Sequence, residues 1–245
     1  GDGHAARVWR ARALNEGPST TARRGAIHGR TMALTFYAAS GSQFAGRVWL
    51  ALEHKGCPYT LRMLSFQEGD HRQPAFLAIN PRHKVPALDD DGFALYESSA
   101  IVEYLDERFP DGPALFPGDL RARALQRRIV AEVDHYLQPL HGRIARQVFF
   151  TPPPNRDADE LAAALDAWAF ELARYEPLLT GDTLGPSLGA ADFTLYPFVA
   201  TAERFDLRHP GLDAQGRLGP NLRAWRDRMR ALPYHDACWP PHWRG

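Results

Sequence analysis

Apolar and polar residues alternate over a short segment that starts at Leu34, which predicts a strand over residues 34–37. Apolar positions within residues 46–55 follow a helical spacing, and Gly56 is placed to end that helix. The pattern then predicts a strand over 59–64, a short helix over 71–79, two strands across the Asp91–Gly92 turn, and a helix that carries Ala100, Ile101, Tyr104 and Leu105. This β-α-β-α-β-β-α order is typical of a mixed sheet covered by helices.

Strand patterns stop at a segment rich in proline and glycine, residues 110–118, which predicts a linker. Beyond it, apolar residues recur at helical spacing from Ile129 to Val148, until three prolines at 152–154 interrupt them. Further helices are predicted over 157–179, 190–204 and 220–231. We therefore expect an α/β domain over residues 32–109, the linker at 110–118 and an all-α domain over 119–245.

Residues 1–31 differ from the rest of the chain because they are rich in Arg, Gly and Ala and hold few large apolar side chains. This composition predicts a disordered extension or an alternative start. The alternative is an organelle transit peptide, since Arg residues outnumber the acids there, but no sustained amphipathic pattern accompanies them.

Composition excludes several classes of partner. Lys plus Arg and Asp plus Glu both number 29, so no net charge draws the protein to nucleic acid or to acidic membranes. No apolar run approaches the roughly 20 residues that span a bilayer. The two cysteines, Cys57 and Cys238, are too few for a disulfide framework and lack a metal-binding spacing, so we expect a cytoplasmic protein without a metal.

Candidate chemistry begins with the stretch from Asn80 to Leu88, which contains Val85-Pro86 and precedes the predicted Asp91–Gly92 hairpin. Glu97-Ser98 then opens the next predicted helix. Together these segments place strand-edge backbone groups beside a helix N-terminus. Such an arrangement can hold a ligand that resembles an amino acid.

The order of these motifs, over about residues 32 to 232, resembles the glutathione S-transferase superfamily. The resemblance implies a thioredoxin-like N-terminal domain, an all-helical C-terminal domain and glutathione as co-substrate. It also implies that the Val85-Pro86 bond is cis and that the Val85 backbone pairs with the cysteinyl part of glutathione. His83 is a departure, because many members have glycine at this position.

Other glutathione contacts also follow from the resemblance. Ser98 would hold the γ-glutamyl carboxylate and Glu97 would face the ammonium group; the alternative is an ordinary helix start. His71 and Lys84 would lie near the glycyl carboxylate, although a solvated histidine at a helix start is an equal alternative for His71.

The reactive centre is expected where the first strand leads into the first helix. Serine-type members of the superfamily carry a Ser five residues before the Arg of an Arg-Val motif, and counting back from Arg47 reaches Ser42. The resemblance implies that Ser42 donates a hydrogen bond to the glutathione thiolate, and the alternative is that it only caps the helix. Ser40 and Tyr37 are the other candidates for this role.

Two further motifs refine the expectation. Ser42-Gln43-Phe44-Ala45 stands where thioredoxin-like oxidoreductases have two cysteines, which excludes dithiol exchange at that site. The segment 187–193 resembles the superfamily's S/T-x-x-D box, but Gly189 occupies the cap, so only Asp192 is expected to bond back to the Gly189 N–H.

We therefore expect a glutathione S-transferase that conjugates the thiolate to small, hydrophobic electrophiles, as in detoxification. Phe44, Tyr136 and Phe149 are candidate walls of the electrophile pocket. The alternatives are a glutathione-dependent isomerase, dehalogenase or peroxidase, or a binding module without turnover. Members commonly dimerise, so a homodimer is implied by the resemblance alone.

Overall fold

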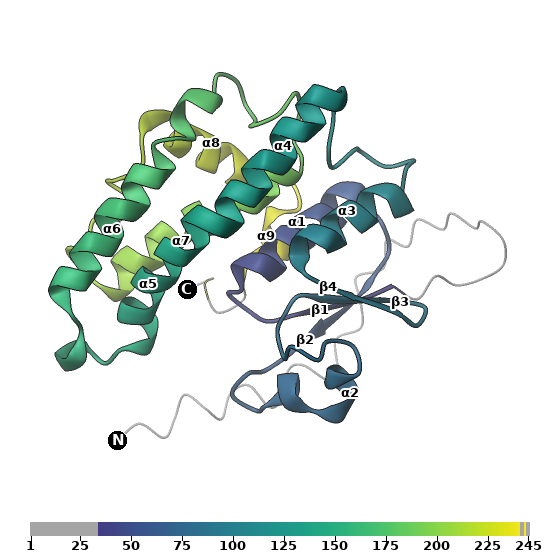
Figure 1. The fold of residues 1–245 in the computed structure, drawn as a ribbon, viewed down its shortest axis with the longest axis horizontal. Coiled ribbons are helices and arrows are strands. Elements are labelled where there is room, and N and C mark those ends of the chain that lie inside the picture. The colour runs from purple at the N-terminus through teal and green to yellow at the C-terminus, as the bar shows by residue number, and fades with distance from the viewer. Residues whose placement is uncertain (1–33, 241–242, 244–245) are drawn as a thin grey trace. The chain divides into compact units, whose positions relative to one another are not determined.

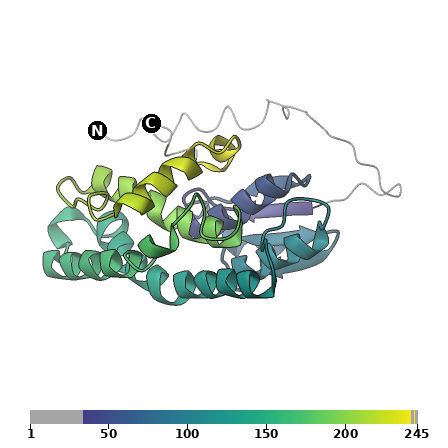
Figure 2. The ribbon, with the colours of Figure 1, turned by 90° about the horizontal axis from the view of Figure 1, so that it is seen from above.

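The computed structural model describes residues 34–240 and Trp243. The predicted extension, residues 1–31, lies outside these residues. The described chain starts with a sheet and its helices and continues as a set of helices (Figures 1 and 2).

The sheet is mixed and has four strands in the order β2-β1-β3-β4. Its strands are β1 (Leu34–Ala38), β2 (Thr60–Met63), β3 (Ala87–Asp90) and β4 (Phe93–Tyr96). β1 runs parallel to β2 and antiparallel to β3, which is antiparallel to β4. Alternate residues of β1 are fully buried, so its two faces support two different clusters of side chains.

Three helices accompany the sheet: α1 (Gln43–Lys55), α2 (Pro74–Leu77), which follows the 3₁₀ turn η2 (Asp70–Arg72), and α3 (Ser98–Arg108). The predicted order of elements and the thioredoxin-like fold are confirmed. α1 starts three residues earlier than the apolar spacing indicates because Ser42 caps it, and it ends at Gly56, whose φ of 64° is left-handed.

The hairpin between β3 and β4 turns at the predicted dipeptide. Asp91 and Gly92 both have positive φ angles, 55° and 91°, as a two-residue turn of this kind requires. The Gly92 N–H donates to the Asp89 carboxylate at 2.8 Å, which closes the turn.

The segment between α3 and the next helix has no helix or strand, but it is anchored. Leu115 and Phe116 are buried, and the Asp106 carboxylate accepts from the Leu115 N–H at 2.7 Å. The Leu115 carbonyl in turn accepts from the Ala190 N–H at 2.7 Å. The division of the chain at residues 110–118 stays a prediction, since the sheet part and the helical part share one apolar core.

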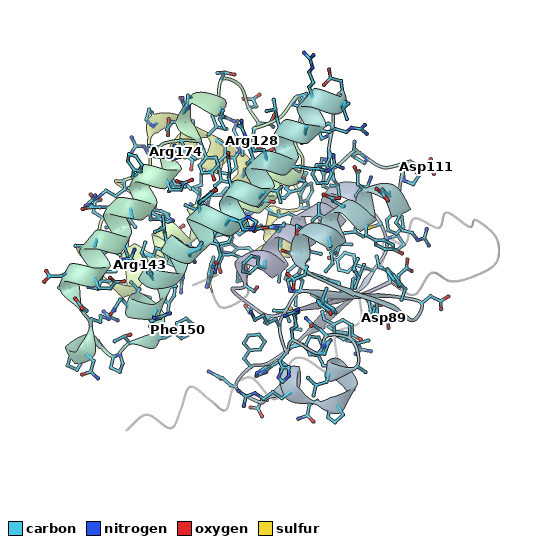
Figure 3. The ribbon with its side chains drawn as sticks, viewed as in Figure 1. Asp89, Asp111, Arg128, Arg143, Phe150 and Arg174 are labelled. Atoms are coloured by element: carbon cyan, nitrogen blue, oxygen red, sulfur yellow. The ribbon has the colours of Figure 1, made fainter. Side chains whose placement is uncertain are left out.

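The first helical run is interrupted by two π-helical turns. It consists of α4 (Leu120–Glu132), η3 (Val133–Leu137), α5 (Gln138–Ala145) and η4 (Arg146–Phe150). Pro139 explains the first interruption, because it has no N–H to donate to the carbonyl four residues earlier, and a π turn accommodates this loss. Phe150, at the end of the run, is exposed (Figure 3).

The remaining helical elements are η5 (Pro153–Asn155), α6 (Ala158–Leu172), η6 (Glu176–Leu178), α7 (Ala190–Arg208), α8 (Pro220–Arg230) and α9 (His235–Cys238). α6 ends at Leu172, before the predicted residue 179, and the Arg174 and Tyr175 N–H groups then bond to carbonyls three residues earlier. Asp192 of α7 accepts from the Gly189 N–H at 3.2 Å, as predicted, and also from Trp225 Nε1 at 2.9 Å. None of the helices within the described residues is long and apolar enough to cross a membrane.

Candidate functional site

The topology of the sheet brings the predicted motifs to one edge. β1 ends at Ala38, and its parallel neighbour β2 ends beside it at Met63. β3 starts at Ala87, opposite Tyr37, and β4 ends at Tyr96, opposite Ala87. The segments after β1, β2 and β4 and the segment before β3 therefore meet at this edge.

Ser42 follows β1 and caps α1. Its Oγ accepts from the Ala45 N–H at 3.2 Å, and its own N–H donates to the Ala39 carbonyl at 3.2 Å. A serine hydroxyl has one hydrogen in addition to its acceptor lone pairs, and the cap uses only a lone pair. Ser42 can therefore cap the helix and donate to a ligand at once, beside the partial positive charge of the helix N-terminus.

The two alternative residues have different surroundings. Tyr37 lies on the side of β1 that packs with Phe76 of α2, at 5.6 Å between ring centroids, whereas Phe36 belongs to the core formed with α1. Ser40 is exposed in the β1–α1 connection. Of the three candidates, Ser42 alone occupies the cap of α1.

The segment before β3 is shaped by a residue whose role the sequence patterns missed. Asn80 is 2% exposed, and its amide nitrogen donates to the Lys84 carbonyl at 2.7 Å while its oxygen accepts from the Arg82 N–H at 2.9 Å. The sequence feature that could have indicated this role was the Asn80-Pro81 dipeptide, because Asn-Pro favours a turn. Asn80 therefore fixes the shape of the chain that leads to Val85.

The Val85–Pro86 bond is cis, which confirms the expectation. Neither the N–H nor the C=O of Val85 forms a hydrogen bond with another described residue, so both are available to a peptide ligand. His83 has a φ of 58°, a left-handed conformation that glycine adopts more easily, and this accounts for the glycine that many members have here.

Glu97 also has a left-handed φ, 72°, where the chain turns from β4 into α3. A strained backbone at a non-glycine residue is often found at a ligand site. Glu97 forms no side-chain cap, and Ser98, the first residue of α3, is buried. The free N–H groups at the start of α3 are therefore suited to an anionic group.

His71 and Lys84 occupy the flanks of this edge. His71 lies in η2, with its ring 4.5 Å from that of Phe66, and its buried Nδ1 has no hydrogen-bond partner among the described residues. Lys84 is exposed beside Val85. Their contacts with glutathione stay predictions.

A cavity of about 40 Å³ lies next to Ser42, between the start of α1, α7 and the C-terminal segment. Tyr196 and Pro197 of α7 and Cys238, Trp239 and Trp243 contribute to its lining. Sequence patterns missed the two tryptophans, because nothing local relates the end of the chain to the first helix. The aromatic residues clustered at the C-terminus were the only signal.

The three aromatic residues predicted as pocket walls, Phe44, Tyr136 and Phe149, do not line this cavity. Phe44 packs against Phe198, at 5.8 Å between ring centroids, and does not line this cavity. Tyr136 is 62% exposed, and Phe149 packs on Phe205 at 5.4 Å. The role of these three aromatic residues as walls of the electrophile pocket stays a prediction.

The described lining of the cavity has no Lys, Arg, Asp or Glu side chain. Burial raises the pKa of the Cys238 thiol and of the Tyr196 hydroxyl, so both remain protonated at neutral pH. Tyr196 Oη lies 2.7 Å from His235 Nε2, which gives the hydroxyl a partner. The cavity thus offers a mainly apolar surface, and His235 is an ionisable member of its lining. In the described part of the chain, no group of three or more His, Cys, Asp or Glu side chains is arranged to hold a metal ion.

Comparison with known proteins identifies one family over most of the chain. Residues 36–113 match the model of the glutathione S-transferase N-terminal domain, and residues 137–233 match that of the C-terminal domain. Maleylacetoacetate isomerase of Pseudomonas aeruginosa is 37% identical over 205 residues, which cover 81% of this chain and 91% of the relative.

Two further proteins extend the comparison. Maleylpyruvate isomerase of a Ralstonia species is 34% identical over 176 residues, covering 66% of this chain and 78% of the relative. The glutathione-bound structure of the theta class glutathione S-transferase from Xanthomonas axonopodis pv. citri superimposes with a TM-score of 0.71 at 28% identity, over 84% of this chain and 97% of that one. The chain belongs to the glutathione S-transferase superfamily.

Proposed function

We propose that this protein is a serine-type glutathione transferase in which Ser42 stabilises the glutathione thiolate. The observation that carries the proposal is the position of Ser42, whose Oγ caps α1 through a lone pair while its hydrogen remains available. A hydrogen bond to a thiolate and the helix dipole both favour the ionised form. A free thiol has a pKa near 8.5, and each unit by which it is lowered corresponds to about 1.4 kcal/mol.

The remaining parts of glutathione would use the same sheet edge. The backbone of Val85 pairs with the cysteinyl residue, the Ser98 hydroxyl and the N–H groups at the start of α3 donate to the γ-glutamyl carboxylate, and Glu97 balances the ammonium group. Lys84 and His71 lie toward the glycyl carboxylate. These assignments are supported by the unpaired Val85 backbone and by the uncapped start of α3.

The electrophile is inferred from the lining beside Ser42. A mainly apolar surface without Lys, Arg, Asp or Glu favours a hydrophobic substrate, such as an activated aromatic halide or an α,β-unsaturated carbonyl compound. With the halide, the sulfur forms a bond to carbon and halide leaves. With the unsaturated carbonyl, the sulfur adds to the β-carbon and a proton from water completes the product.

The test is an assay of 1-chloro-2,4-dinitrobenzene with glutathione, combined with calorimetry of glutathione binding. Formation of the thioether and release of chloride in a 1:1 ratio would support conjugation. No detectable binding of glutathione at millimolar concentration would contradict the proposal, since the site would then lack its co-substrate.

A second candidate, glutathione-dependent cis–trans isomerisation, is favoured by the isomerases among the relatives. In that reaction the thiolate adds to a carbon of the double bond, the adduct rotates about the resulting single bond, and the thiolate is eliminated as the double bond re-forms, so glutathione is not consumed. Maleylpyruvate tests it: isomer formation without loss of glutathione indicates isomerisation. The described lining of the cavity holds no Lys or Arg to pair with the two carboxylates of a maleyl acid.

The cellular setting is part of the proposal. Cys57 and Cys238 are buried and unpaired, as suits a reducing cytoplasm, and detoxification would follow from a broad range of electrophiles. We also propose a homodimer, on the basis of the family, which light scattering after size-exclusion chromatography would test by giving twice the mass of the 27.4 kDa chain.

A further inference from the structure

A tyrosine and a histidine meet at the cavity beside Ser42, although they are 39 positions apart in sequence. Tyr196 belongs to α7 and His235 begins α9, and Tyr196 Oη lies 2.7 Å from His235 Nε2. Both side chains are buried, and both line the cavity. Figure 1 shows α9 next to α1, the helix that Ser42 caps. The pair therefore borders the space in which the proposed electrophile meets the glutathione sulfur.

The second ring nitrogen of His235 faces the surface. His235 Nδ1 lies 3.5 Å from a carboxylate oxygen of Asp236, whose side chain is fully exposed. Trp239 packs on the His235 ring, at 4.9 Å between ring centroids, and holds it in this orientation. A histidine can take up a proton at one ring nitrogen and give one from the other. These side chains thus connect solvent with the cavity in the order Asp236, His235, Tyr196.

No other ionisable side chain in the described lining has such a connection. Besides Tyr196 and His235, the lining contains the Cys238 thiol, which has no hydrogen-bond partner among the described residues. The charged side chains near Tyr196 lie outside the lining and form two ion pairs, Arg230 with Glu203 and Arg226 with Asp227. A proton for a bound substrate would therefore come through His235 and Tyr196.

One of the two reactions proposed above needs such a proton. When sulfur adds to the β-carbon of an α,β-unsaturated carbonyl compound, the electrons of the double bond move onto the α-carbon and the carbonyl oxygen. The enolate that forms must then be protonated, because otherwise it can expel the thiolate again. When sulfur replaces the halide of an aromatic compound, the halide carries the electron pair away and no proton is taken up.

We propose that Tyr196, supplied by His235, is the catalytic proton donor for conjugation of α,β-unsaturated carbonyl compounds; this inference rests on the function proposed for Ser42. The α-carbon bonds to the hydroxyl hydrogen of Tyr196, the electrons of that O–H bond stay on Oη, and Oη takes the Nε2 hydrogen of protonated His235. A protonated imidazole has a hydrogen on each nitrogen, so Nε2 donates to Oη and leaves the tyrosine hydrogen for the substrate. Solvent beside Asp236 then returns a proton to His235, which balances the proton that glutathione released when its thiol ionised.

The test compares two electrophiles with the same protein: 4-phenyl-3-buten-2-one, an enone that needs the proton, and 1-chloro-2,4-dinitrobenzene, which does not. We expect Tyr196→Phe to lower the ratio of the two turnover numbers, enone over halide, about ten-fold or more, since general acid catalysis contributes about 10²–10⁴-fold. His235→Gln should also lower the ratio, because an amide can donate to Oη but takes up no proton. The ratio does not depend on the folded fraction of a variant, so a loss of stability alone leaves it unchanged.

A second tyrosine–histidine pair provides a matched control. Tyr234 Oη lies 2.9 Å from His54 Nδ1 and joins α1 to the start of α9, but neither residue lines the cavity. Tyr234→Phe removes a hydrogen bond of the same kind and should leave the ratio within about two-fold.

The outcomes separate this proposal from the function on which it rests. An unchanged ratio in Tyr196→Phe or in His235→Gln, or an equal fall in Tyr234→Phe, would overturn the proton path. Turnover of the halide but not of the enone by the wild type would overturn it as well, while conjugation at Ser42 would stand. Turnover of neither compound by the wild type would refute both.

Discussion

Arg47 and Asp134 form an ion pair that ties the start of α1 to the π-helical turn η3. Arg47 Nη1 lies 3.0 Å from one carboxylate oxygen, and Nη2 contacts the other. The Arg47 side chain is 1% exposed and that of Asp134 is 23% exposed. Because Ser42 is at the cap of the same helix, this pair holds the first turn of α1 against the helical part of the molecule.

We predict that Asp134→Asn destabilises the protein and also lowers turnover. Loss of one partner leaves a buried, unpaired guanidinium, and a partly exposed pair should lose about 2–3 kcal/mol of unfolding free energy. Turnover should fall because the turn that carries Ser42 loses its anchor. Urea unfolding and steady-state kinetics with glutathione measure the two effects.

The opposite end of α1 offers a matched control. Lys55 and Asp106 form a pair at 3.0 Å with nearly the same burial, 1% and 22% exposed. Asp106→Asn should destabilise the protein at least as much, since Asp106 also accepts from two backbone N–H groups, but should leave turnover of the folded enzyme unchanged. Similar losses of turnover in both variants would show that the Arg47 pair has no specific effect on the site.

The role of Ser42 is tested by Ser42→Ala. We expect turnover to fall about ten-fold or more and the pKa of the bound thiol to rise, because a hydrogen bond to a charged group is lost. The variant also loses a helix cap, worth about 1 kcal/mol. Asp119→Ala controls for this, since Asp119 caps α4 through an equivalent bond from the Ala122 N–H at 2.8 Å. Unchanged pH–rate behaviour in Ser42→Ala would move the role to Ser40 or Tyr37.

Sequence patterns predicted most of the fold because its turns, helix ends and caps depend on residues that are close in sequence. The Asp91–Gly92 turn, the stop of α1 at Gly56 and the bond from Asp192 to the Gly189 N–H each depend on residues close in sequence. Element boundaries were less accurate where a capping side chain sets them, as Ser42 does for α1.

The site was predicted less completely, for a physical reason. The motif at Ser42 and the cis Val85–Pro86 bond came from resemblance, whereas the contact of Arg47 with Asp134 joins residues 87 positions apart. The tryptophans near Ser42 are equally remote in sequence. Tertiary packing decides such contacts, and no periodicity along the chain records them.

The buried His141 should make the protein less stable as the pH falls. It is fully buried between Phe198 and Phe205, and burial lowers its pKa to about 3. An unfolded histidine has a pKa near 6.5, so between pH 6.5 and pH 3 the unfolded chain binds the extra proton. The contribution of neutral His141 is therefore complete above pH 6.5 and is lost as the pH falls toward 3.

We expect His141→Leu to lose less stability than the wild type between pH 7 and pH 4, as measured by urea unfolding at each pH. The exposed His135 on the same helical run is the control, and His135→Leu should keep the acid sensitivity of the wild type. Parallel stability curves for wild type and His141→Leu would mean that other groups cause the acid sensitivity.

Replacing Asn80 should weaken the binding of glutathione and leave the rate of the chemical step nearly unchanged. Its amide group holds the Lys84 carbonyl and the Arg82 N–H, so it shapes the chain that presents the Val85 backbone. Asn80→Ala removes both bonds, and each is worth about 1 kcal/mol, so the KM for glutathione should rise about ten-fold or more. At saturating glutathione kcat should change little, because Ser42 lies on a different segment.

Arg82→Ala is the matched control, since it removes an exposed side chain of the same turn and retains the backbone bond to Asn80. A fall in kcat without a rise in KM would show that Asn80 does not position the glutathione-binding backbone.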